Sequence, residues 1–113
     1  MERFAWTAQL LPGRLDEYIR RHDEIWPEMT AVLEEAGIRN YSIWTDGQVL
    51  FGYYECDSVA RAAAVQAASQ VVSRWNEYMK DVMVMAFDPQ SGTSVRLRQV
   101  FMHPRPGGDT APG

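Results

Sequence analysis

Tyr18 and His22 stand four residues apart in a segment that is predicted to be helical. Residues at this spacing lie on one face of a helix, about one turn apart. A phenol and an imidazole therefore project from a stripe that continues with the apolar Ile25, Trp26 and Met29. An imidazole titrates at about pH 6.5 and can exchange protons in both directions near neutrality. Because leucine would pack better at both positions, we interpret the pair as a candidate site. The alternative is that both polar tips reach the helix edge and are satisfied there.

The composition is that of one soluble domain of 113 residues, with a net charge of −4 and a pI of about 5.1. No basic run is present, which argues against a nucleic-acid partner. No apolar stretch approaches the length of a membrane span, and the N-terminus begins in a strand pattern, so we expect a cytoplasmic protein. Cys56 is the single cysteine and is expected to pack in the core. With only His22 and His103 as histidines, no cluster has the spacing of metal ligands, and we expect no metal.

The first part of the chain predicts one strand followed by an interrupted helix. Residues 3–11 alternate between apolar and more polar side chains, which is typical of a strand, and Pro12-Gly13 turns the chain. A helix is predicted from about residue 14 to residue 23. Pro27 restarts it, because proline fits the first turn of a helix, and Gly37 is a suitable residue to end it.

The dipeptide Asp46-Gly47 predicts a hairpin between strands at residues 38–45 and 48–56. Counting outward from that turn pairs Trp44 with Val49 and Tyr41 with Gly52. Gly52 would then leave a gap beside the Tyr41 phenol in which a ligand could sit. One face of the hairpin is predicted to hold Trp44, Val49, Phe51 and Tyr53, and the other to hold Tyr41, Ile43, Leu50 and Tyr54.

The second part of the chain predicts a helical region at residues 59–82, with Ser58 as its N-cap and a break at Ser69. Residues 83–94 read as a long loop, and the alternation at residues 95–102 predicts a final strand. The last ten residues, 104–113, hold only Pro, Gly, Asp, Thr, Ala and one Arg, and we expect a disordered tail after a domain at 1–103.

The predicted order of elements is strand, helix, strand, strand, helix, strand, which is the ferredoxin-like βαββαβ pattern of α+β proteins. The two predicted helical segments can cover only one face of a four-stranded sheet. The face with Trp44, Val49, Phe51 and Tyr53 is too apolar for water, so we expect two sheets to pack face to face in a homodimer.

Four motifs in this chain resemble those of the L-rhamnose mutarotase family, with nearly unbroken spacing over residues 3 to about 102. The motifs are Tyr18-x-x-x-His22-x-x-Ile25-Trp26-Pro27-Glu28, Asn40-Tyr41, Arg74-Trp75-x-x-Tyr78-Met79-x-Asp81-Val82-Met83 and Val100-Phe101. The first and third are specific in combination. The resemblance implies a dimeric α+β barrel, in agreement with the two-faced sheet.

The resemblance also implies an activity, the interconversion of the α and β anomers of a deoxyhexose such as L-rhamnose by an isomerase without a cofactor. His22 matches the catalytic proton donor of the family. Tyr18 and Tyr41 match substrate-binding tyrosines, and Trp75 matches the first of two tryptophans that line the sugar site. Mutarotation opens the ring, so a proton must reach the ring oxygen while another leaves the anomeric hydroxyl.

Asn76 occupies the position of the second family tryptophan. It lies at a sugar-contacting position, so the substrate could be a related sugar. Two other functions stay open at this point. One is a cofactor-free cyclase or small monooxygenase of the same barrel fold that acts on an aromatic or polyketide substrate, and the other is a binding module without catalysis. The joint presence of Tyr18, His22 and Tyr41 argues against the latter.

Overall fold

A four-stranded antiparallel sheet in the order β2-β3-β1-β4 forms the centre of the fold. It is seen in a computed structural model that describes residues 1–85 and 95–104. Along the chain the elements are β1 (Glu2–Leu10), α1 (Leu15–Asp23), α2 (Pro27–Glu35), β2 (Arg39–Asp46), β3 (Val49–Cys56), α3 (Val59–Ala68), α4 (Gln70–Met79) and β4 (Met83–Met85). Each helical connection is made of two helices, so the order is βαββαβ. The predicted ferredoxin-like α+β fold is confirmed.

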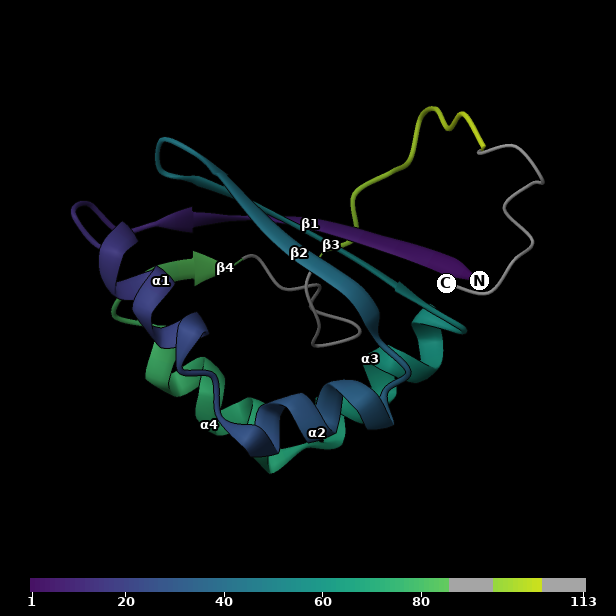
Figure 1. Ribbon diagram of the computed structural model, residues 1–113, viewed down its shortest axis with the longest axis horizontal. Coiled ribbons are helices and arrows are strands. Elements are labelled where there is room, and N and C mark those ends of the chain that lie inside the picture. The colour runs from purple at the N-terminus through teal and green to yellow at the C-terminus, as the bar shows by residue number, and fades with distance from the viewer. Residues whose placement is uncertain (86–94, 105–113) are drawn as a thin grey trace.

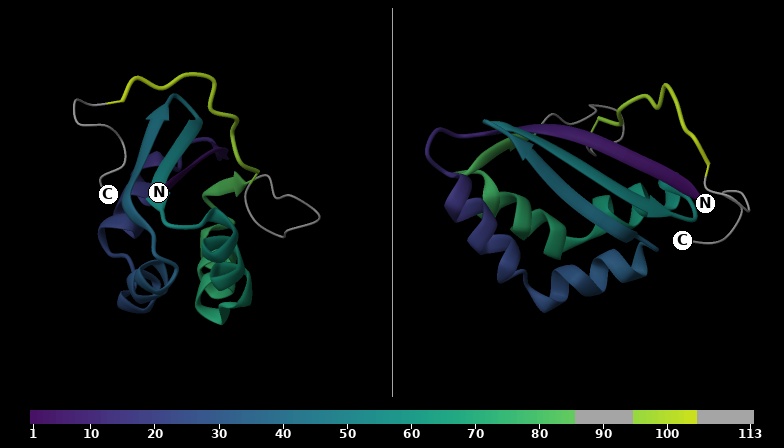
Figure 2. Two further views of the ribbon diagram at one scale, coloured as in Figure 1. Left: turned by 90° about the vertical axis from the view of Figure 1, so that its right-hand side faces the viewer. Right: turned by 45° about the horizontal axis from the view of Figure 1, so that its top comes forward.

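All of the helices lie on one side of the sheet (Figure 1). Seen from the end of the molecule, α1 and α2 form one column and α3 and α4 form a second column beside it (Figure 2). Residues 95–104, drawn in yellow, run along the opposite side of the sheet. The sheet thus has one face toward the helices and one face that no helix of the described chain covers.

Each helical column bends at the residue that the sequence indicated. Trp26 has an extended backbone (φ −64°, ψ 136°), and Pro27 begins α2, where its missing N–H leaves no hydrogen bond unmade. Ser69 is also extended, and its hydroxyl accepts a hydrogen bond from the N–H of Val72 at 3.3 Å, which caps α4. The two breaks let each column arch away from the sheet, which leaves room between the layers.

The core lies between the sheet and the helices. Alternate residues of β1 and β3 point toward the helices and are buried: Phe4, Trp6, Ala8 and Leu10, and Leu50, Gly52, Tyr54 and Cys56. Cys56, at the end of β3, is 0% exposed, in keeping with its expected packing role.

The predicted register of the hairpin is wrong by two residues. Trp44 lies opposite Phe51 and Ile43 opposite Gly52, because the two residues outside the ladder at the turn are Gly47 and Gln48. A shift of two residues keeps every side chain on its face. Trp44, Val49, Phe51 and Tyr53 therefore do share the face away from the helices. Gly52, however, is not opposite Tyr41, and the gap predicted there does not exist.

The predicted last strand is also wrong. Met83–Met85, placed in a loop by the sequence analysis, forms β4 and pairs with Ala8, Gln9 and Leu10 of β1. Residues 95–102 form no strand, although the N–H of Leu97 donates to the carbonyl of Ala5 at 2.7 Å. Alternation shows that a segment suits a sheet, but it does not supply a neighbouring strand. The rest of the predicted loop (86–94) and nearly all of the predicted tail (105–113) lie outside the described residues.

Candidate active site

A cavity of about 1120 Å³ lies between the sheet and the two helical columns. All five residues singled out in the sequence border it: Tyr18, His22, Tyr41, Trp75 and Asn76. They come from α1, β2 and α4, so the site exists only once both columns have packed on the sheet. The charged residues that border the cavity, Asp23, Glu77 and Lys80, are exposed. Its interior is therefore lined by apolar and neutral polar groups, which suits an uncharged ligand with hydroxyl groups.

His22 is held in one tautomer by its own helix. Its Nδ1 lies 3.1 Å from the carbonyl oxygen of Tyr18, one turn earlier in α1. A carbonyl only accepts hydrogen bonds, so Nδ1 carries the proton and Nε2 keeps its lone pair. Burial lowers the pKa of His22 below 6.5, opposed by this hydrogen bond and by the charge of Asp23. The imidazole is therefore neutral at pH 7, with Nε2 able to take up a proton.

Tyr18 is buried beside His22, and the two rings are stacked with centroids 4.3 Å apart. Burial raises the pKa of Tyr18 well above its usual range, so the phenol stays protonated. No hydrogen bond of its hydroxyl is present within residues 1–85 and 95–104. The hydroxyl is thus available to a ligand in the cavity.

Tyr41 reaches the cavity from the edge strand β2, within a bulge-like shift of the β2–β3 register between Arg39 and Ser42. At this bulge Asn40 has a left-handed backbone (φ 51°), a conformation that asparagine tolerates better than most residues. The side-chain amide of Asn40 donates to Glu55 at 2.7 Å, which ties the bulge to β3. The Tyr41 hydroxyl accepts a hydrogen bond from Trp6 Nε1 at 3.1 Å. Tyr41 is 36% exposed as a whole residue, but desolvation of its phenol is the main cause that raises its pKa, so it too remains protonated.

Trp75 belongs to an aromatic cluster that joins α1, α2 and α4. Its ring meets that of His22 edge-on at 5.5 Å and that of Trp26 edge-on at 5.1 Å, and Tyr78 packs against both tryptophans. Trp75 is buried, whereas Asn76 is exposed at the rim of the cavity. Adjacent helical residues point about 100° apart, which explains this division between wall and rim.

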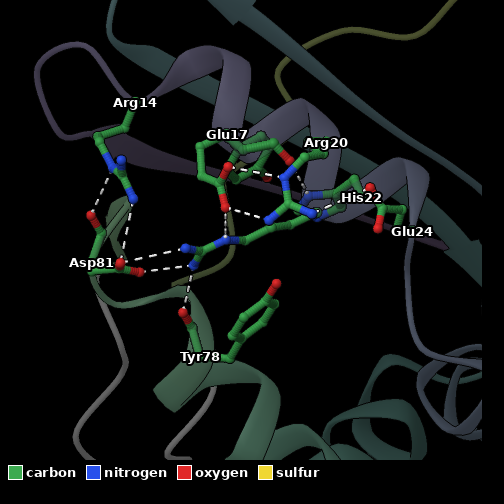
Figure 3. A network of polar contacts seen from close by, with 9 residues as sticks. Arg14, Glu17, Arg20, His22, Glu24, Tyr78 and Asp81 are labelled. Carbon is green, nitrogen blue, oxygen red and sulfur yellow. Dashed lines mark hydrogen bonds and ion pairs between the residues drawn. The ribbon is translucent and has the colours of Figure 1, made fainter.

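Beside Tyr78 of this cluster, Arg21 connects α1 to the end of α4, and Figure 3 shows its partners Glu17, Tyr78 and Asp81. Its guanidinium lies 4.3 Å from the centroid of the Tyr78 ring and donates to the Tyr78 carbonyl at 2.7 Å. It also pairs with Glu17 at 2.6 Å and with Asp81 at 2.8 Å. A buried arginine with all of these partners fixes the distance between the helix of His22 and the helix of Trp75.

The contributions of Trp6 and Arg21 were not apparent from the sequence. Trp6 was visible only as one member of an alternating strand, and its neighbour Tyr41 is far away in the chain. Arg21 lies beside His22 in the sequence, but its partners Tyr78 and Asp81 come from the last third of the chain. A single sequence carries no signal for such long-range pairs.

Among residues 1–85 and 95–104, no three His, Cys, Asp or Glu side chains gather where they could hold a metal ion. None of the helices in this part of the chain is long and apolar enough to cross a membrane.

Comparisons with known proteins agree with the motifs. Residues 3–103 match the family model described as L-rhamnose mutarotase. The chain is 44% identical to the L-rhamnose mutarotase of Pectobacterium carotovorum over 103 residues, which are 89% of this chain and 97% of that protein.

Among solved structures, the L-rhamnose mutarotase of Formosa agariphila superimposes with a TM-score of 0.73 at 29% identity, covering 91% of this chain and 99% of that one. Tetracenomycin F2 cyclase from Streptomyces glaucescens, a type-II polyketide cyclase, gives a TM-score of 0.68 at 14% identity, over 94% and 100% of the two chains. At that identity the cyclase shows a shared fold and nothing about chemistry.

Proposed function

Because the chain belongs to the L-rhamnose mutarotase family, we propose that it is an isomerase that interconverts the α and β anomers of L-rhamnose. The observation that carries the proposal is one cavity bordered by His22, whose Nε2 makes no hydrogen bond within residues 1–85 and 95–104, and by the protonated phenols of Tyr18 and Tyr41. This set combines one imidazole that can exchange protons with two phenols that can donate hydrogen bonds, and it contains no charged group, which suits the opening of a neutral pyranose.

The reaction requires two proton transfers and no net change. In ring opening, the anomeric hydroxyl loses a proton while the ring oxygen gains one, and the C1–O5 bond breaks to give an aldehyde. Rotation about the C1–C2 bond presents the other face of the aldehyde, and closure reverses both transfers. His22 can perform both transfers: Nε2 takes the proton of the anomeric hydroxyl and passes it to the ring oxygen as the C1–O5 bond breaks, and in closure it carries a proton from the sugar hydroxyl back to the carbonyl oxygen. This cycle includes the donor role implied by the family.

The other residues bind the sugar in this proposal. The hydroxyls of Tyr18 and Tyr41 bind sugar oxygens, and the indole of Trp75 covers an apolar part of the sugar such as the 6-methyl group. Asn76 contacts the sugar from the rim, where its amide can donate and accept hydrogen bonds. These roles are supported by the position of all four residues around one cavity with His22.

We also propose that the protein is a homodimer joined through the open face of the sheet and located in the cytoplasm. The dimer is supported by the exposure of large apolar residues on that face, with Trp44 at 68% and Phe51 at 42%. The cytoplasmic location rests on the sequence alone. The alternative of an aromatic or polyketide cyclase has no support beyond the shared fold.

The test is NMR exchange spectroscopy between the α and β anomer signals of L-rhamnose, with and without the protein. Native protein should accelerate exchange, and His22→Ala should lower the enzymatic rate by about 100- to 10,000-fold with its fold retained. The matched control is His103→Ala, since His103 is the only other histidine and is exposed outside the cavity. A native protein without effect on exchange would refute the proposed function, and an active His22→Ala variant would refute the role of the imidazole.

A further inference from the structure

The Trp6 indole lies so close to the backbone of Gly52 that a residue with a Cβ atom would not fit at position 52. A Cβ atom on Gly52 would lie 2.0 Å from Cε2 of the Trp6 indole and 2.3 Å from its Nε1. The two residues are directly paired across β1 and β3, and both side-chain positions face the helices. Gly52 has no left-handed backbone, so glycine is needed here for space alone. The indole therefore lies flat over β3, in the space that a side chain would otherwise fill.

From this position the Trp6 indole reaches a residue of the candidate site. Its Nε1 donates to the Tyr41 hydroxyl at 3.1 Å, and Trp6 is only 3% exposed. An indole N–H can donate but cannot accept. The direction of this hydrogen bond is therefore fixed, with Tyr41 as the acceptor.

The consequence for Tyr41 concerns its own proton. A phenolic oxygen that accepts from one side has its O–H left to donate elsewhere. The Tyr41 ring is already held by the bulge at Asn40 and by the Tyr54 ring, whose centroid lies 5.2 Å away. The ring is thus held in place, but its O–H could still rotate about the C–O bond. The hydrogen bond from the Trp6 N–H restricts this rotation. The O–H of Tyr41 can then point away from Trp6, toward the cavity that both residues border.

We propose that Trp6, lying in the space provided by Gly52, is a positioning residue that makes Tyr41 a hydrogen-bond donor to a sugar oxygen in the cavity. The inference rests on the proposed function for the identity of the ligand. Trp6 acts through Tyr41 and takes no part in proton transfer. Its effect therefore belongs to sugar binding, and it should be lost when Tyr41 has no hydroxyl.

A double-mutant cycle tests this coupling. Trp6→Phe keeps an aromatic ring and removes the N–H, and Tyr41→Phe removes the hydroxyl. Each single variant should raise KM for L-rhamnose by about 2- to 10-fold, the range for one neutral hydrogen bond, while kcat changes less than twofold. The double variant should have the KM of Tyr41→Phe, because its two residues act as one unit. Effects that multiply in the double variant would show that Trp6 contributes packing only, and would overturn the inference.

A rescue experiment separates orientation from packing. Gly52→Ala forces the indole out of place and should lower the thermal unfolding temperature as well as raise KM. Adding Trp6→Leu to Gly52→Ala removes the indole atoms nearest the new methyl group, so it should recover part of the stability. The KM of this pair should stay raised, because the N–H is still missing. Recovery of native KM together with stability would contradict the proposal.

An NMR experiment tests the hydrogen bond between Trp6 and Tyr41 without relying on enzyme turnover. The indole N–H signal of Trp6 in a ¹⁵N–¹H correlation spectrum is identified by its loss in Trp6→Phe. This signal should shift in Tyr41→Phe, in which the indole loses its acceptor. In native protein, the same signal should shift when L-rhamnose is added. An unshifted signal in Tyr41→Phe overturns the inference. If native protein leaves anomer exchange unchanged while this signal still responds to Tyr41→Phe, the proposed function fails and the Trp6–Tyr41 contact stands.

Discussion

At the scale of single residues, the environment of His22 determines how the protein should respond to pH. Its pKa is lowered by burial, so the neutral imidazole persists to more acidic pH than a free histidine would. Proton uptake at Nε2 requires this neutral form. We therefore expect kcat/KM for anomer exchange to fall as the pH drops, with a midpoint below 6.5.

Asp23→Asn tests whether protonation of His22 causes this fall of kcat/KM at low pH. The charge of Asp23 raises the pKa of His22, against the larger effect of burial. Asp23→Asn should therefore move the midpoint of the pH profile further down. The ring-proton signals of His22, followed by NMR across the same pH range, should titrate at the kinetic midpoint. A midpoint above 6.5 would contradict the neutral starting state.

Asn76 carries a prediction about substrate choice. An amide at the rim offers hydrogen bonds where an indole would offer apolar contact and shield the sugar from water. A site that hydrogen-bonds a hydroxyl discriminates more strongly than one with apolar contacts alone. The native amide should therefore favour a sugar that offers it a hydroxyl. The indole of Asn76→Trp should favour an apolar contact instead and shift the preference toward L-rhamnose, relative to L-fucose, D-glucose and D-ribose, in the anomer-exchange assay. An unchanged ranking of the sugars would show that Asn76 does not determine specificity.

Helix geometry identified the two cavity residues that lie close together in the chain, the family motifs supplied Tyr41, Trp75 and Asn76, and the contacts between distant strands were missed. Tyr18 and His22 are one helical turn apart, so their neighbourhood follows from helix geometry. The predicted gap at Gly52 was wrong because the indole of Trp6, from another strand, occupies that space. Contacts between strands depend on a register that periodicity alone does not fix.

At the scale of secondary-structure elements, the network around Arg21 should make the packing of α1 on α4 sensitive to acid. Hydrogen bonds from Arg20 and Arg21 lower the pKa of Glu17 from 4.5 to about 2. The unfolded chain then binds a proton more readily than the folded one between these values. The stabilisation is complete above about pH 4.5 and is lost as the pH falls toward 2.

Glu17→Gln tests this contribution. The variant should be less stable than native protein at pH 7, and its thermal unfolding temperature should fall less steeply between pH 4.5 and 2. Glu34→Gln, which changes an exposed carboxylate of α2 outside this network, should keep the native pH dependence. Equal slopes for native protein and Glu17→Gln would show that the ion pairs with Arg20 and Arg21 do not stabilise the fold.

Element boundaries followed from the sequence wherever a residue determines its own backbone. Pro27 and Ser69 mark the helix breaks, and Gly37 has the positive φ of 74° that suits a residue after a helix. The last strand was misplaced because β4 is only three residues long and its pairing with β1 is a long-range property. A short apolar run beside a loop gives too little pattern to be recognised.

At the scale of the whole molecule, the open sheet face predicts self-association. Trp44 and Phe51 lie opposite each other on β2 and β3, on the face away from the helices. The segment 95–104 runs along the same side of the sheet (Figure 1), and two of its residues, Val100 and Phe101, are 86% and 79% exposed. Apolar surface of this kind is stabilised by burial against a second copy. Light scattering at low micromolar concentration should give twice the 12.9 kDa mass of the chain.

A charge on this face should separate the copies. Phe51→Glu should reduce the scattering mass toward that of a monomer, because an unpaired carboxylate cannot be buried without a large cost. Ala64→Glu places the same charge on an exposed position of α3, across the molecule from the open face, and should leave the mass unchanged. A native protein that scatters as a monomer would refute the dimer.

The burial of Cys56 makes thiol labelling a measure of local opening in the sheet. This residue is the only thiol of the chain, it is 0% exposed at the end of β3, and burial raises its pKa. Thiol reagents attack the thiolate, so the folded protein should be almost inert toward them, and modification has to wait until the end of the sheet opens. With reagent in excess, the labelling rate then reports how often that strand end separates from its neighbours under native conditions. Because Cys56 does not border the cavity, the same reaction with and without sugar would reveal whether a ligand between the layers steadies the far end of the sheet.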